Sequence, residues 1–182
     1  MADKEDKVHA GTMAALLKEK PKRGRPRRAV ARQNVYVALS REQKEIMKRL
    51  AAQLPQGLVR ADIPDLAITT LAVRMEALRR AVADRSREIP EGITDLDSLY
   101  LLWDLPLPLP GEARWTSLRV SPQEAIELGR VQGTLHVIFG TTRSETFSLA
   151  LALLQQLLED YPPKEEKMTL NEMRQKITGI YL

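Results

Sequence analysis

Two stretches of the chain share one order of strand, helix cap and helix. Residues 35–47 read VYVALSREQKEIM, and residues 116–128 read TSLRVSPQEAIEL. In both, apolar and polar residues alternate up to a serine, after which apolar residues recur at helical spacing. Alternation is typical of a strand with one buried face, and serine is a favoured residue just before a helix. The chain is therefore predicted to contain one strand-helix unit twice.

The first unit occupies residues 33–85. Ser40, with Gln43 three residues later, is a capping-box signature for a helix start. We expect this helix over residues 41–54 and a second helix over about residues 62–85. The apolar side of the predicted strand consists of Val35, Val37 and Leu39.

The second unit, residues 114–161, repeats this order. Ser121 with Glu124 is a second capping-box pattern, and Thr142 with Glu145 starts a further helix. The apolar side of its predicted strand consists of Thr116, Leu118 and Val120.

The offset between the two units is nearly constant. Ser40 and Ser121 are 81 residues apart, and Asp65 and Glu145, near the starts of the second helices, are 80 residues apart. Capping boxes and amphipathic helix pairs are common, so two such units can also occur by chance in an α+β protein. The constant offset favours a duplication whose two copies bury one shared core.

Each unit is predicted to contain a strand, a serine cap, a helix, a turn and a second helix, with a glycine-containing turn and a helix opening TTRSETFSLAL in the second unit. This order resembles the ribbon-helix-helix superfamily of DNA-binding proteins. In that family two copies, normally on two chains, pair their strands into an antiparallel ribbon that enters the major groove. The resemblance implies a mainly α fold with a two-stranded antiparallel ribbon, made from two fused ribbon-helix-helix repeats. Because fusion makes the pairing intramolecular, we expect a monomeric pseudo-dimer in solution.

Three further segments complete the predicted organisation. Residues 1–32 carry ten Lys or Arg against four Asp or Glu and lack an apolar period, which predicts a disordered basic arm. Residues 86–113 carry one positive and six negative charges and form an acidic Pro/Leu-rich linker. Its DLDSLYLLWDL stretch predicts a short packed helix rather than a free tether. Residues 162–182 form a C-terminal tail or helix.

The arm contains PKRGRPRR, which resembles the AT-hook. The resemblance implies binding in the narrow minor groove of AT-rich DNA, whose negative potential attracts arginine. A basic arm that only neutralises phosphates and a nuclear-localisation run are open alternatives. The residues concerned are Lys22, Arg23, Gly24, Arg25, Pro26, Arg27 and Arg28.

The solvent-facing side of the ribbon is expected to read DNA bases. Arginine can bridge guanine O6 and N7, asparagine can pair with adenine N6 and N7, serine suits either, and alanine can contact a thymine methyl. For the aromatic residues Tyr36 and Trp115, covering the ribbon edge or packing on the linker is an open alternative to contact with a base. Because the two strands differ, the expected DNA site is asymmetric. The candidate base readers are Asn34, Tyr36, Ala38, Trp115, Ser117 and Arg119.

The starts of the second helices are expected to bind DNA phosphates, because exposed N–H groups and the helix dipole favour anions. Thr142, Arg143 and Ser144 suit this role in the second unit. In the first unit the sequence RADIPD puts two aspartates at this place. Arg60 is therefore expected to offset their repulsion of a phosphate.

Several classes of function are disfavoured. The chain has no cysteine, which excludes a disulfide framework and fits a reducing cytoplasm. His9 lies in the arm, and His136 lies in an apolar helical stretch, where a packed core histidine is expected rather than a catalytic base. No stretch supplies the roughly 18 apolar residues of a membrane span. We predict a soluble cytoplasmic protein that is not an enzyme and uses no cofactor or metal.

DNA binding admits more than one biological role. The fused arrangement resembles the relaxosome accessory proteins of conjugative plasmids and the overdrive-binding accessory protein of the VirC operon in T-DNA transfer. This implies double-stranded DNA and a relaxase or other DNA-processing protein as partners. Transcription regulation at an asymmetric site is a second role. The alternative is an antitoxin-type interaction protein that grips a partner through residues 162–182 and binds DNA secondarily.

Overall fold

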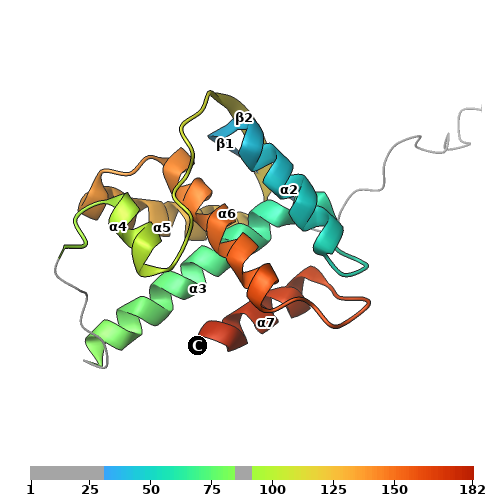
Figure 1. Cartoon of the computed structure of the whole chain (residues 1–182). Helices are drawn as coiled ribbons and strands as arrows, with labels where there is room; N and C mark the ends of the chain where they lie inside the picture. The colour runs from blue at the N-terminus through green and yellow to red at the C-terminus, as the bar shows by residue number, and fades with distance from the viewer. Residues whose placement is uncertain (1–30, 85–91) are drawn as a thin grey trace, which may run out of the picture.

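The computed structural model describes residues 31–84 and 92–182. Within these residues the chain is mainly helical and has one two-stranded antiparallel sheet (Figure 1). The AT-hook-like residues 22–28 lie outside the described part. The elements are β1 (Gln33–Ser40), α2 (Arg41–Gln53), the short 3₁₀ helix η1 (Arg60–Asp62), α3 (Ile63–Ala83), α4 (Leu96–Leu102), β2 (Ala113–Val120), α5 (Pro122–Phe139), α6 (Arg143–Asp160) and α7 (Leu170–Tyr181).

Strands β1 and β2 are far apart in the sequence but pair as an antiparallel ribbon at one end of the molecule (Figure 1). Gln33 lies opposite Val120, and Ser40 lies opposite Ala113. The predicted alternation is confirmed, because one side of the ribbon is buried on the helices and the other faces solvent. The buried side chains are Val35, Val37, Leu39, Leu118 and Val120.

The helices that follow the strands begin at the two predicted serine caps. The Ser40 hydroxyl accepts a hydrogen bond from the Gln43 N–H, and the Gln43 side chain accepts one from the Ser40 N–H, at 3.2 and 2.9 Å. At Ser121 only half of the predicted box is formed. Its hydroxyl accepts the Glu124 N–H at 3.4 Å, but its own N–H donates to Asp65 Oδ1 at 2.8 Å. The second helix pair is thus tied to α3 at its start.

Helices α3 and α6 cross in the middle of the molecule and form its most extensive helix contact (Figure 1). Helix α2 packs mainly on α6, and α5 packs mainly on α3. The segments before and after the linker are therefore interleaved rather than stacked as separate halves. One continuous cluster of buried apolar side chains runs through both segments, so the described residues share one core.

The described part of the linker packs on this core. Tyr100 of α4 is buried, as is Trp103 just after it. The Gln156 Nε2 donates a hydrogen bond to the Trp103 carbonyl oxygen at 3.0 Å, which joins the linker to α6. The Arg74 guanidinium of α3 lies 5.8 Å from the centre of the Trp103 ring and 5.0 Å from that of Tyr181. The predicted packed helix in the linker is confirmed.

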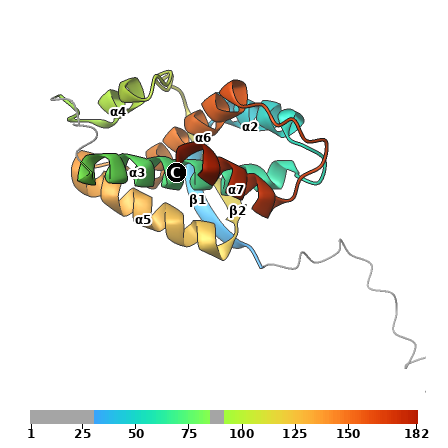
Figure 2. The same ribbon diagram turned by 90° about the horizontal axis from the view of Figure 1, so that it is seen from below.

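The C-terminal helix α7 packs along α3 (Figure 2), and its residues Met173 and Ile177 are buried. The loop before it pairs with the loop after α2. The Gln56 N–H donates to the Glu166 carbonyl at 2.8 Å, and the Met168 N–H donates to the Gln56 carbonyl at 2.9 Å. The C-terminal segment is thus an integral part of the fold.

In the described residues, no helix combines the length and the apolarity needed to cross a membrane.

The expectation of a core position for His136 was wrong, because its neighbour Leu135 takes the core-facing side of α5. His136 lies near the exposed end of the helix, with its Nδ1 at 3.0 Å from the Thr141 carbonyl oxygen.

Candidate nucleic-acid interface

The solvent-facing side of the ribbon brings all six predicted base readers onto one surface. The antiparallel pairing sets them directly opposite one another as three cross-strand pairs. Opposed residues on one face of such a ribbon have Cβ atoms about 4.5–5.5 Å apart, so these side chains form a continuous patch. Five of them are exposed, and Ala38 is half-buried. The pairs are Asn34 with Arg119, Tyr36 with Ser117, and Ala38 with Trp115.

The two aromatic residues of this face point into solvent. Tyr36 is 59% exposed and Trp115 is 76% exposed. At these exposures neither ring is packed into the core or buried under the described part of the linker. Large rings left this exposed on an ordered strand are available for contact with a partner.

The start of α6 is only partly open to an anion. The Thr142 hydroxyl and N–H both donate to the Glu145 carboxylate, at 2.8 and 2.7 Å, which confirms the predicted capping box. The Ser144 hydroxyl accepts a hydrogen bond from the Ala38 N–H at 2.9 Å. Both hydroxyls therefore have partners within the fold. Thr142 and Arg143 are exposed and Ser144 is half-buried, so Arg143 is the exposed cation among the three predicted phosphate-binding residues.

The start of α3 is closed. Asp62 and Asp65 are buried, and the Arg32 guanidinium lies between them, with Nη2 at 2.5 Å from Asp62 Oδ1 and 3.2 Å from Asp65 Oδ2. The expectation that Arg60 offsets these carboxylates was wrong. Arg32 does so, because it directly precedes β1 and lies against the turn that begins α3, whereas Arg60 is exposed.

Two more charged side chains complete this buried ion cluster. Arg174 Nη2 of α7 lies 3.2 Å from Glu124 Oε1 and 3.6 Å from Asp65 Oδ2. Burial raises the pKa of Glu124 to about 7, although the nearby Arg174 opposes this rise. Burial also raises the pKa of Asp65, against the opposing effects of the Ser121 N–H and both guanidiniums. The members of the buried ion cluster are Arg32, Asp62, Asp65, Glu124 and Arg174.

A basic groove lies between β2, α2 and η1. Three cationic side chains line it, namely Lys44, Arg60 and Arg119, together with apolar side chains such as Met47 and Pro64. Lys44 was missed in the sequence, although its place in the first turn after a ribbon strand is a usable signal. Arg60, expected at a helix start, here contributes to the wall of this groove.

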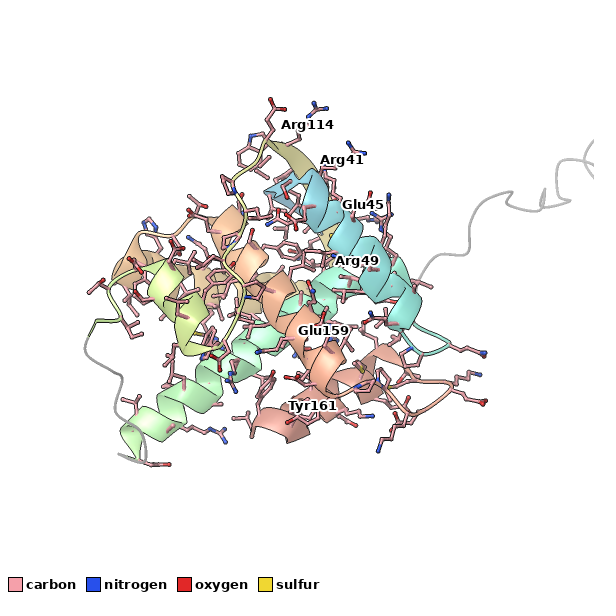
Figure 3. All side chains as sticks on the ribbon, viewed as in Figure 1. Arg41, Glu45, Arg49, Arg114, Glu159 and Tyr161 are labelled. Carbon is pink, nitrogen blue, oxygen red and sulfur yellow. The ribbon has the colours of Figure 1, made fainter. Side chains whose placement is uncertain are left out.

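A second groove adjoins the first at the end of the ribbon where β2 begins, and Leu39 and Lys44 line both grooves. Arg41 and Arg114 both line the second groove, and they project at the end of the molecule where α2 and β2 begin (Figure 3). Arg114 has a side chain that is 82% exposed. Neither arginine was a sequence-based candidate. Arg41 directly follows β1 and Arg114 is the second residue of β2, so both cations lie at the end of the ribbon where β1 ends and β2 begins.

Comparisons with known proteins found no matching family model, no similar curated protein and no similar solved structure. Function is therefore inferred from the side chains and the geometry of this chain alone.

Proposed function

We propose that the chain binds double-stranded DNA by inserting the β1–β2 ribbon into the major groove. The observation that carries this proposal is the set of three exposed cross-strand pairs, set on a ribbon whose other side is buried. A major groove about 12 Å wide admits a two-stranded ribbon. Asn34 and Arg119 have the donors and acceptors that distinguish adenine and guanine in that groove.

We further propose that the chain consists of two fused ribbon-helix-helix repeats. With the 81-residue offset that relates Ser40 to Ser121, the strand pairing is symmetric about Tyr36 and Ser117. An approximate two-fold axis would pass between these two residues. In this symmetry α2 corresponds to α5, and α3 corresponds to α6. The packing of α2 on α6 thus corresponds to the packing of α5 on α3, and both contacts are present.

Phosphate contacts are proposed at the cations that surround the ribbon. Lys44 and Arg60 line the groove beside β2, Arg41 and Arg114 line the adjoining groove where β2 begins, and Arg143 begins α6. Cations that neutralise phosphates release counterions, so affinity would fall as salt rises. These contacts would set the position of the ribbon, while the ribbon face would read the sequence.

The proposed setting is accessory binding in plasmid conjugation or DNA transfer, with a relaxase or other DNA-processing protein as partner, or transcription regulation. One observation favours these settings over the antitoxin-type alternative. The apolar residues Met173 and Ile177 of the C-terminal segment are buried in the core and so do not offer a gripping surface.

Selection of bound duplexes from a random pool, followed by affinity measurement at fixed salt, tests the proposal. Replacing Asn34, Ser117 and Arg119 with alanine is expected to remove most of the preference for selected over random DNA. Each good contact contributes about 1–3 kcal/mol of discrimination. A matched control replaces Arg130 and Thr134, both exposed on α5, and should keep the preference.

Two results would count against readout by the ribbon. One is unchanged discrimination in the triple variant. The other is loss of all binding when residues 1–30 alone are deleted, which would assign the affinity to the arm. That deletion keeps Arg32, which pairs with Asp62 and Asp65 in the buried ion cluster.

A further inference from the structure

The two ends of the ribbon face differ in chemistry. At one end Asn34 and Arg119 are paired, and both side chains carry hydrogen-bonding groups. At the other end Ala38 is paired with Trp115, which gives a mainly apolar surface. The two kinds of surface lie on opposite sides of the central pair, Tyr36 with Ser117. Each end of the ribbon would therefore contact a different half of a DNA site.

Each end matches a different chemical feature of the major groove. Amide and guanidinium groups can bind bidentately to the N7 edges of adenine and guanine. A methyl group and an indole ring suit the apolar C5-methyl of thymine, although the indole N–H remains a donor. The Asn34–Arg119 end thus fits a half-site read at purine edges, and the Ala38–Trp115 end fits one read through thymine methyls.

Arg32 ties the N-terminal end of the described chain to the Asn34–Arg119 end of the ribbon. Its Nη1 donates to the Arg119 carbonyl oxygen at 3.1 Å and also to the Ala61 carbonyl oxygen. Its side chain is only 9% exposed and is paired with two buried carboxylates. Ala31, which precedes it, is exposed. By contrast, Glu112 and the linker lead into β2 at the opposite end.

We infer that the protein binds its DNA site in one orientation. The purine-edge half lies on the side of Ala31, and the thymine-methyl half lies on the side of Glu112. This inference rests on the proposed function, because it assigns the two ends of the same ribbon face to two halves of the bound duplex.

Position-specific DNA cleavage tests the orientation. The chain has no cysteine, so Ala31→Cys and Glu112→Cys each provide a single attachment point for an iron-chelate cleavage reagent. Both positions are exposed, with the Glu112 side chain 91% exposed. On a selected duplex, we expect the reagent at residue 31 to cut one flank and the reagent at residue 112 to cut the other.

Modified bases identify which half adjoins each flank. Substituting 7-deazaguanine for guanine in the half nearest residue 31 should weaken wild-type binding about tenfold and leave the Arg119→Ala variant unaffected. Substituting uracil for thymine in the other half removes the methyl groups. This change should weaken the wild type more than the Trp115→Ala variant.

The outcomes separate the two proposals. Sequence-specific binding with equal cleavage of both flanks from each position would overturn the single orientation and leave the proposed function intact. Cleavage of opposite flanks would also overturn it if 7-deazaguanine weakened binding in the half nearest residue 112 and uracil weakened binding in the half nearest residue 31. Binding without any sequence preference would contradict readout by the ribbon itself, and the orientation with it.

Discussion

At the scale of single residues, Glu124 shows how strongly burial and charge compete in this fold. Its side chain is 3% exposed, and its ion pair is with Arg174. Among the residues that the structure describes, Glu124 shares Arg174 with the buried Asp65, so two carboxylates compete for one guanidinium in a poorly solvated place. A proton on Glu124 removes the cost of burying its charge.

The stability of the protein should therefore depend on pH through Glu124. Its pKa is about 7 in the folded protein and ordinary in the unfolded chain, so the folded state binds the proton more tightly. The resulting stability is full below the unfolded pKa and is lost as the pH rises through about 7, by up to about 3 kcal/mol. Glu124→Gln should flatten this decline. Urea unfolding at pH 5 and pH 8 measures it, and parallel declines in variant and wild type would contradict the assignment.

Replacing Arg32 should be costly, because it removes a cation that pairs with two buried carboxylates. Arg32→Met is expected to lower the free energy of unfolding by about 3–5 kcal/mol. Lys48→Met is the matched control, since Lys48 pairs with Glu45 at 2.5 Å but both side chains are 53% exposed. That control should lose less than about 1 kcal/mol. Chemical denaturation compares the two, and equal losses would refute a structural role for Arg32.

At the scale of elements, local signals predicted much of the fold. The alternation of apolar residues identified both strands, and the caps at Ser40 and Thr142 identified two helix starts. The composition of the ribbon face followed from the same alternation. The buried ion cluster could not be predicted, because Arg32 and Arg174 carry no local sign of their partners and meet them only through tertiary packing.

The loop between α2 and η1 offers a test of how the C-terminal segment is held. Gly57 has a φ of 97°, and a Cβ there would lie 2.9 Å from the Met168 carbonyl oxygen. Gly57→Ala should therefore destabilise the protein by about 1–2 kcal/mol from backbone strain, with more from the close contact. Gly129→Ala in α5 meets nothing within 4 Å and should stabilise by about 0.5–1 kcal/mol. Thermal unfolding of both variants checks this, and a neutral Gly57→Ala would refute the tight approach.

At the scale of the whole molecule, one shared core predicts one unfolding transition. The chain has two tryptophans, Trp103 buried at 3% exposure and Trp115 on the ribbon face. In a Trp115→Phe variant, fluorescence reports Trp103 alone, next to the helices of both segments. Its urea midpoint should coincide with that of far-UV circular dichroism. Two separate transitions would show that the segments fold independently.

The pairing of β1 with β2 also constrains how the chain emerges from the ribosome. Each residue of β1 meets a partner that is translated about 70–90 residues later. At about 5–20 residues per second, the wait is on the order of ten seconds. During that interval the apolar side of β1, with Val35, Val37 and Leu39, has neither its partner strand nor α6 to cover it. Nascent-chain chaperones would therefore meet an unpaired β1 together with α2 and α3, whose partner helix α6 is also untranslated.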